Sequence, residues 1–519
     1  RLWNVSICKT IYFRIKRRIL KKQVMKNINK KISISIIIIA SLFIVNGCSD
    51  DYLENTKVYA EDSESFFNSE ADYYNALVAA YDPLQSTFIN VLMGEIASNN
   101  TLCGGESATD VAGYQQVDDM IHTPVNAQLQ NLWSWMYGGV NRAAYIIEFQ
   151  DKTDFTGKEV IIGEASFLRA YYNFELVKWF GAIPIKPEGR FVVGDEQTIP
   201  RAPVAEVYAL IEADLQVAVS NLAYTAPQVG RVTKGAAEAL LGKVYLYQDK
   251  FTEAAVVLES VINNGSYSLE SDYNKIFESQ GENGVGSVFE VQYTDVEGAG
   301  FGCLQCSEGN VAVGFQGVRG YDGDLFTSGF SFNVPTQEMV DQFEGGDNRK
   351  DVAILDIEAW ATATGASYTT GYEHTGFFNR KYIPRKRSAT AAGDQNLTNP
   401  NNYRAIRFAD VLLMAAEANN RKATGNDTKA QLYLNTVRAR AFGNSDNDIT
   451  SSGSNLTAAI YKERRVELVG EGHHFFDLVR TGRGAQISGF TANKNELFPI
   501  PLEEIQFSQG NWTQNQGYN

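Results

Sequence analysis

Residues 241–258 read Leu241-Gly-Lys-Val-Tyr-Leu-Tyr-Gln-Asp-Lys-Phe-Thr-Glu-Ala-Ala-Val-Val-Leu258. The opening Leu-Gly-x-x-Tyr is followed nine residues after the tyrosine by Ala254 and then by Leu258, the spacing of a tetratricopeptide repeat. In such a repeat, small residues let two antiparallel helices approach, and larger residues fill the groove between them. Because one helix pair cannot bury its own apolar face, further pairs must stack beside it.

Helical periodicity elsewhere in the chain supplies candidates for these further pairs. In residues 159–180, apolar side chains from Ile161 to Trp179 recur at the spacing of an amphipathic helix, which Gly181 and Pro184 end. The predicted pairs are 133–150 with 159–180, 204–222 with 233–248, and 405–421 with 428–442. We therefore predict a mainly α fold with a tetratricopeptide-like helical repeat scaffold.

The composition and the hydrophobic pattern of the sequence change in residues 281–400. Glycine becomes frequent, helical periodicity disappears, and short strand-like runs such as 287–293 lie between turns. A second irregular stretch, 97–123, interrupts the N-terminal helices. Long irregular regions in compact proteins are usually functional. We expect one domain over 66–519, in which 66–280 and 401–519 form the scaffold and 281–400 form an irregular, loop-rich lobe with short strands that binds ligand.

The start of the chain has the features of an export signal. From Met25 a basic segment precedes a run of 14 apolar or small residues, too short to span a membrane, and then Gly47 and Cys48. This arrangement resembles a bacterial lipobox, in which the cysteine is acylated. We expect residues 1–24 to be upstream read-through, 25–47 a lipoprotein signal peptide, Cys48 the lipidated residue, and 48–65 an acidic tether.

The charge of the expected mature chain is strongly negative. Residues 1–47 hold eleven of the 46 Lys and Arg residues, which leaves 35 basic against 61 acidic residues and a net charge of −26. Such a surface repels phosphate backbones, so we expect no nucleic-acid partner, and it suits a neutral ligand. Cys303 and Cys306 form a lone CxxC, which predicts a local loop disulfide or nothing functional, and not a zinc site.

Four further stretches carry a resemblance to a known family. They are Ala165–Tyr172 running into Trp179–Pro184, then Arg407–Ala418, Glu463–Arg480, and Leu497–Ile505, with a closing Asn515-Gln-Gly-Tyr518. Together they resemble the RagB/SusD family of surface nutrient-binding lipoproteins, over nearly the whole expected mature chain. The resemblance implies four tetratricopeptide-like helix pairs that support an irregular lobe.

The same resemblance implies a function at the cell surface. Members capture oligosaccharides or polysaccharides, or in some cases peptides, and act as the lid of a TonB-dependent, SusC-like outer-membrane transporter. We therefore expect a neutral glycan ligand, anchorage to the outer membrane through lipid, and no cofactor. The alternatives are a peptide-binding member, a glycoside hydrolase, and a helical scaffold used only for protein contacts.

No catalytic motif supports the hydrolase alternative. The sequence lacks a Gly-x-Ser-x-Gly elbow, a His-Glu-x-x-His pair and a Gly-x-x-x-x-Gly-Lys phosphate loop. The charged residues of the motifs lie in apolar-rich helices, where they must pair with one another. Adjacent His473 and His474 diverge by roughly 100° on a helix and do not converge on one metal ion. We predict a binding protein, not an enzyme.

Candidate ligand-binding residues are chosen by their location in the two irregular regions. Sugar faces are apolar and their rims polar, so capture needs aromatic platforms and hydrogen-bonding side chains. The aromatic candidates are Tyr114, Phe301, Phe315, Tyr321 and Trp360, and the candidate hydroxyl partners are Asp110 and Asp118. In contrast, Trp133, Trp135 and Trp179 lie on predicted helical faces and are expected in the core.

Overall fold

The computed structural model describes residues 66–298, 300–386 and 391–518. Phe67–Asn519 form one compact unit, and this is the unit described below. The predicted read-through, signal peptide, Cys48 and tether lie outside the described residues. Over the part of the chain that is described, no helix has both the length and the apolar character that crossing a membrane requires.

The unit is mainly helical, as the sequence predicts. The longer helices are α2 (Glu70–Tyr81), α3 (Phe88–Ile96), α5 (Ala127–Glu148), α6 (Lys158–Phe180), α8 (Val204–Asn221), α9 (Lys234–Leu246), α10 (Phe251–Asn264), α15 (Phe408–Arg421), α16 (Asp427–Phe442) and α17 (Gly453–Glu467). The shorter ones are α4 (Ala112–Asp118), α7 (Asp195–Thr198), α11 (Ala312–Gln316), α12 (Gln337–Val340), α13 (Lys350–Ala353), α14 (Ile357–Thr364), α18 (His474–Arg480) and α19 (Leu502–Phe507). Two 3-10 turns, η2 (Asp82–Thr87) and η5 (Leu304–Cys306), lie near the candidate site.

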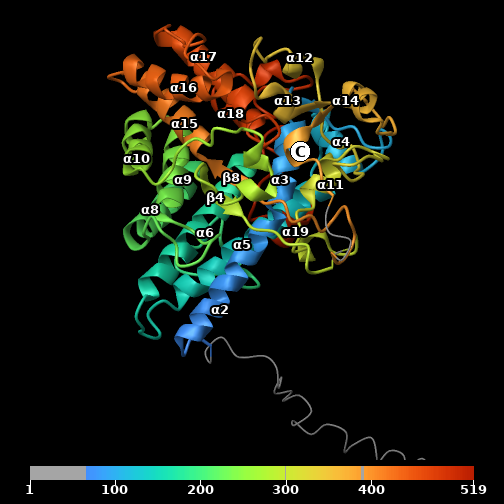
Figure 1. The fold of residues 1–519 in the computed structure, drawn as a ribbon. Helices are drawn as coiled ribbons and strands as arrows, with labels where there is room; N and C mark the ends of the chain where they lie inside the picture. Colours follow the sequence, from blue (N-terminus) through green and yellow to red (C-terminus); the bar gives the residue numbers. More distant parts are fainter. Residues whose placement is uncertain (1–65, 299, 387–390, 519) are drawn as a thin grey trace, which may run out of the picture. The chain divides into compact units, whose positions relative to one another are not determined.

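Consecutive helices pack side by side in an array, with α5 on α6, α6 on α8, α8 on α9, α9 on α10, α10 on α15 and α15 on α16 (Figure 1). The three predicted helix pairs are therefore confirmed, with small shifts at their ends. In the repeat itself, a Cβ on Gly242 of α9 would lie 2.5 Å from Leu258 of α10. Glycine is required there because the leucine fills the space between the two helices.

Helix α6 departs from the amphipathic pattern of its sequence. It covers the predicted residues and ends at Gly181, but its side chains are buried on almost every side from Ile161 onward. Because α5, α8 and α2 all pack against it, no face remains for water. Polar residues that would mark an exposed face are instead paired inside, as in the Arg169–Asp214 ion pair at 2.7 Å.

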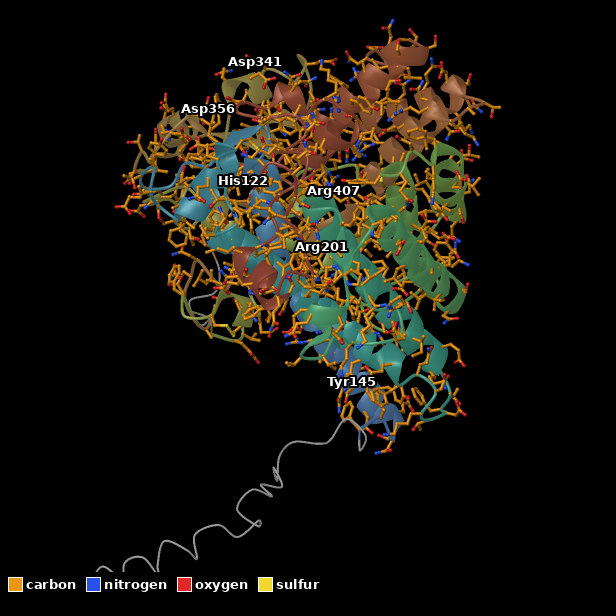
Figure 2. All side chains as sticks on the ribbon, turned by 180° about the vertical axis from the view of Figure 1, so that it is seen from behind. His122, Tyr145, Arg201, Asp341, Asp356 and Arg407 are labelled. Atoms are coloured by element: carbon orange, nitrogen blue, oxygen red, sulfur yellow. A yellow bond between two sulfur atoms is a disulfide. The ribbon has the colours of Figure 1, made fainter. Side chains whose placement is uncertain are left out.

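The closing segment of the chain fastens the end of α6. The Asn515 amide donates to the carbonyls of Phe180 (2.9 Å) and Phe498 (2.7 Å). Arg201, labelled in Figure 2, donates a hydrogen bond to the carbonyl of Ala182 at 2.8 Å. The Leu497–Ile505 stretch and the closing tetrapeptide therefore have a structural role, because together they hold the C-terminal end of α6 in place.

Buried charges of the C-terminal stretches are paired across helices, as the sequence predicts. Glu467 accepts hydrogen bonds from Arg407 (2.7 Å), Arg440 (2.8 Å) and Arg349 (2.9 Å). Burial alone would raise the pKa of Glu467, but these guanidinium groups hold it well below its usual range. The other pairs include Arg464 with Asp410 (2.6 Å) and Asp477 (3.0 Å), Arg480 with Glu417 (2.7 Å), and Arg407 with Glu471 (2.7 Å). We call the pairs around α15, α17 and α18 the ion-pair network.

Short strands occur in the loop-rich lobe, as expected, and some of them pair with strands outside it. The four two-stranded sheets of the described residues are β1 (Thr101–Leu102) with β5 (Val334–Pro335), β2 (Ile183–Pro184) with β3 (Arg201–Ala202), β4 (Ser287–Val291) with β8 (Tyr403–Arg407), and β6 (Ile354–Asp356) with β7 (Phe377–Asn379). In Figure 1, α4 of the N-terminal irregular region and α11 and α14 of the lobe lie together on the side of the unit away from α8 and α10, and we include 97–123 in the loop-rich lobe from here on.

Candidate functional site

The two irregular regions of the sequence meet in the structure. Strand β1, from the first region, pairs with β5, from the second. Beside this sheet, the Gly105 N–H donates to the carbonyl of Ser331 at 2.9 Å. Gly104 has a φ of +61°, and a Cβ there would lie 2.1 Å from the same carbonyl oxygen. Glycine at 104 is thus needed for the close approach that joins the two loop regions.

An aromatic cluster fills the junction. Tyr114 packs edge-on against Phe315 at a centroid distance of 5.8 Å and against Phe332 at 5.8 Å. Phe315 extends the cluster to Phe330 at 5.7 Å, and Phe330 contacts Phe301 at 5.9 Å. The cluster therefore joins two of the predicted residues, Tyr114 and Phe315, to a third, Phe301, through aromatic neighbours.

Exposure divides the members of this cluster. Tyr114 is 1% exposed and Phe315 is also buried, so neither presents a ring face to solvent in this structure. Phe301 is 60% exposed, and Phe330, which contacts it, is half-buried. We call these two rings the Phe301–Phe330 edge. It is the part of the cluster where a ligand can stack.

Tyr321 and Trp360 form a separate group with Phe326. The Trp360 indole N–H donates to the Tyr321 hydroxyl at 3.0 Å, and its ring packs against Phe326 at 5.4 Å. The Arg380 guanidinium lies 5.3 Å from the centre of the Trp360 ring. Tyr321 is buried and Trp360 partly buried, so this pair belongs to the core of the lobe more than to its surface.

The two candidate aspartates hold loops in place. Asp110 accepts a hydrogen bond from the Glu106 N–H at 2.8 Å and pairs with Arg319 at 3.3 Å. Asp118 accepts from the Cys103 N–H at 2.8 Å. Burial raises the pKa of Asp118 to about 8, and the nearby Glu373 carboxylate acts in the same direction. Both carboxyl groups therefore have structural partners within the lobe.

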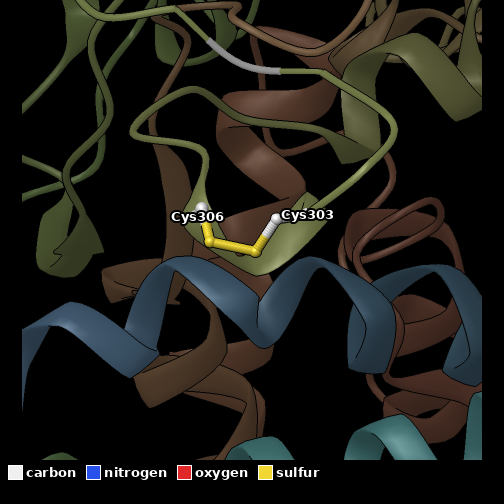
Figure 3. The surroundings of a disulfide bond; sticks show 2 residues. All are labelled: Cys303 and Cys306. Atoms are coloured by element: carbon white, nitrogen blue, oxygen red, sulfur yellow. A yellow bond between two sulfur atoms is a disulfide. The ribbon is translucent and has the colours of Figure 1, made fainter. Parts of the chain in front are cut away.

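A disulfide closes the turn beside the Phe301–Phe330 edge. Cys303 and Cys306 are bonded, in agreement with the first of the two interpretations of the CxxC, a local loop disulfide (Figure 3). The turn η5 that they enclose contacts η2, and Figure 3 shows the disulfide lying over a helical segment from the N-terminal part of the unit. The disulfide therefore fixes the loop that carries Phe301. Cys103 is a buried free thiol.

The remaining residues named from the sequence lie in the interior or in the scaffold. Trp133 and Trp179 are buried as predicted, whereas Trp135 is only partly buried and packs on Phe88. His474 bonds to the Asn99 side chain at 3.1 Å, and burial lowers its pKa to about 3. Within the described ranges no group of three or more His, Cys, Asp or Glu side chains is arranged to hold a metal ion.

Sequence reasoning missed Phe330, the partner ring of Phe301. Phe330 lies in the same Gly-rich region and satisfied the criterion that selected Phe301. The signal that could have found it is the aromatic spacing of Phe326, Phe330 and Phe332, which places several rings on one short loop. Tyr372, whose N–H donates to the Gly105 carbonyl at 2.9 Å, is a further exposed aromatic at the loop junction.

Comparisons with known proteins agree on one family. Residues 286–495 match the SusD family, and residues 51–246 match the family described as starch-binding associating with outer membrane. SusD-like protein P2 of Formosa agariphila is 27% identical over 526 residues, covering 94% of this chain and 100% of that protein. SusD-like protein P38 of the same organism is 26% identical, covering 89% of this chain and 93% of that protein.

Solved structures give the same answer. A laminarin binding SusD-like protein superposes with a TM-score of 0.79 at 35% identity, covering 87% of this chain and 100% of that chain. Surface glycan-binding protein A from Bacteroides thetaiotaomicron, in complex with laminarihexaose, has a TM-score of 0.76 at 26% identity, covering 86% of this chain and 99% of that chain. With its helical array, its loop-rich lobe and a 35% identical relative matched over its full length, this chain belongs to the SusD/RagB family.

Proposed function

We propose that this protein captures a neutral glycan of the laminarin type at the cell surface. The observation that carries the proposal is the 35% identity to a laminarin binding SusD-like protein whose whole length the chain covers. The relative bound to laminarihexaose supports the same class of ligand. A chain rich in acidic residues is suited to an uncharged polysaccharide, since it would repel sulfated or acidic ones.

The Phe301–Phe330 edge is the proposed stacking platform. Its rings offer an apolar face next to loop backbone that can bond sugar hydroxyls, the combination that carbohydrate faces require. In this proposal Tyr114, Phe315 and Tyr321 support the platform from within. Trp360 offers a part of its ring at a second position, and Asp110 and Asp118 hold the surrounding loops.

A binding role without catalysis agrees with the family. SusD-like glycan-binding proteins are non-catalytic, in agreement with the prediction of a binding protein from the sequence. We propose that captured glycan passes to a TonB-dependent, SusC-like transporter for which this protein is the lid, and that acylation of Cys48 anchors it to the outer membrane. Lid opening would be a rigid-body hinge motion, for which the ion-paired scaffold is suited.

The test is calorimetric titration of the chain from Ser49 onward with laminarin and with a panel of other neutral polysaccharides. Reducing ends are assayed in the same samples. We expect saturable binding of laminarin with no new reducing ends. Binding of peptides with no binding of any glycan would overturn the proposed ligand class, and release of reducing sugar would overturn the binding role. For the anchor, Cys48→Ala should shift the protein from the membrane fraction to the soluble fraction.

A further inference from the structure

A groove runs along α2, in a part of the unit that the sequence did not single out. It encloses about 340 Å³ and is lined by Tyr74, Val78, Gln85, Gln228, Gln292 and Glu308, among others. A second cavity of about 630 Å³ continues on the other side of Tyr74 and Arg231, which line both. These volumes lie in the range of small-molecule binding sites. We call the first cavity the α2 groove.

The walls of the α2 groove are fixed by buried contacts. Arg231 forms an ion pair with the buried Glu164, which also accepts a hydrogen bond from Tyr81 at 2.5 Å. Next to it, Gly230 has a φ of +90°, and a Cβ there would lie 2.5 Å from the Gln292 side chain. This glycine lets the loop approach Gln292 closely. The groove is thus preformed, so binding a ligand there costs less conformational entropy of the protein.

The surface of the groove combines an aromatic face with amide side chains. Tyr74 is 38% exposed, and its hydroxyl donates to the Gln228 side chain at 3.2 Å. Val229, at the rim, is 78% exposed. Across the groove, Gln85 donates to Glu308 at 2.8 Å. An exposed ring with planar amides and a carboxylate around it can stack on one sugar face and bond the hydroxyls at its rim.

The charges of the groove favour an uncharged ligand. The guanidinium of Arg231 is neutralised by Glu164, and the carboxylate of Asp82 by Arg142. Glu308 adds a carboxylate that accepts a hydrogen bond from the neutral side-chain amide of Gln85. No excess positive charge is therefore left to attract sulfate, phosphate or uronate groups, and the ligand class matches that of the proposed function.

The groove and the Phe301–Phe330 edge share a loop. Glu308 lies seven residues after Phe301, so their Cα atoms are at most about 25 Å apart even if the chain were fully extended. The Cys303–Cys306 disulfide, whose Cα atoms are 5.3 Å apart, shortens that path. The same turn contacts η2, which carries Gln85. One ordered loop thus links the two surfaces.

We propose that the α2 groove is a second glycan subsite, which binds a segment of the same chain that stacks on the Phe301–Phe330 edge. This inference rests on the proposed function and extends it. A glycan long enough to reach both surfaces gains affinity by making the second contact intramolecular, whereas a short oligosaccharide occupies one surface only. The groove therefore selects for chain length.

The experiment compares laminaritriose with polymeric laminarin by calorimetry, using the chain from Ser49 onward. Tyr74→Ala should leave affinity for laminaritriose at the Phe301–Phe330 edge within about twofold and lower affinity for laminarin at least tenfold. The control Phe507→Ala removes another exposed ring, 59% exposed on α19 and not part of the groove. It should change neither affinity. Melting temperatures of all proteins should agree.

Should Tyr74→Ala fold poorly, Val229→Glu in the exposed rim serves instead and should lower laminarin affinity similarly. Equal affinity of wild type and both groove variants for laminarin would overturn the subsite while leaving the proposed function intact. A wild type that binds no glycan at all would instead overturn the proposed function, and the subsite with it. A groove that binds a peptide from the transporter, with laminarin affinity unchanged by Tyr74→Ala, would also overturn the subsite.

Discussion

Polar segments of the chain are held in place both in the ion-pair network and in the loop-rich lobe, but by different interactions. In the network, buried charges such as Glu467 are each matched by several opposite charges. In the lobe, aromatic edges and glycine turns hold the loops, and Asp118 is bonded to a backbone N–H. Buried charge pairs tolerate little displacement, whereas aromatic contacts leave part of a ring open to solvent. The network is therefore suited to a rigid support, and the lobe to ligand contact.

The largest effect on stability is expected in the network. Glu467→Gln leaves three arginines without their shared carboxylate, so we expect the free energy of unfolding to fall by about 3–5 kcal/mol. Urea denaturation measures this. The control is Glu338→Gln, because the Glu338 side chain is 54% exposed where it pairs with Arg465 at 2.8 Å, so its loss should cost no more than about 1 kcal/mol. Equal losses in the two variants would contradict a special role for the network.

In the lobe the largest effect should be on binding and not on stability. The double variant Phe301→Ala and Phe330→Ala removes the platform, and we expect laminarin affinity to fall by at least about 2 kcal/mol, roughly thirtyfold. Calorimetry measures the affinity, and thermal melting should show little change. Phe507→Ala, which removes an exposed ring outside the lobe, should bind like wild type. Undiminished binding by the double variant would remove the Phe301–Phe330 edge from the site.

The contrast also shows how far the sequence alone could lead. The Leu-Gly-x-x-Tyr pattern predicted the scaffold because Gly242 and Leu258 make a local helix contact that recurs with fixed spacing. The charged motif residues were correctly interpreted as ion pairs, since a buried charge has few alternatives to pairing.

The candidate site was harder to predict, because ring exposure depends on contacts between distant loops. Tyr114 and Phe315 lie in regions that looked irregular, but they belong to the short helices α4 and α11, which pack against α3. Their rings are buried for that reason. Phe330 was overlooked although it shares the same Gly-rich region, and Tyr74 was overlooked because it lies on a scaffold helix.

A smaller effect should follow from loss of the disulfide. Cys303→Ser with Cys306→Ser removes the disulfide. Because the loop it closes is very short, its restriction of the unfolded chain stabilises the folded protein by at most about 2 kcal/mol. Because Phe301 lies two residues before Cys303 in the same loop, we expect laminarin affinity to fall severalfold. Titration under oxidising conditions compares the variant with wild type, and a reducing agent should weaken wild type alone. Equal affinity of the two proteins in both conditions would show that the turn does not position the ring.

A pH dependence of stability is expected from the buried carboxyl of Asp118. Because the pKa of Asp118 is about 8 in the folded state and about 4 when unfolded, the folded protein holds a proton there that the unfolded chain releases. This contribution to stability is full below about pH 4 and is lost as pH rises towards 8. Urea denaturation at about pH 5 and about pH 8.5 should show wild type losing more stability than Asp118→Asn. A parallel change in both proteins would refute it.

The most direct test of glycan capture by the loop-rich lobe is a crystal structure of the chain from Ser49 onward with laminarihexaose. The proposed function predicts a sugar ring within about 4.5 Å of the Phe301 or Phe330 ring, with hydroxyls bonded to the surrounding loops. Laminarihexaose bound only at a surface that contains neither ring would contradict it.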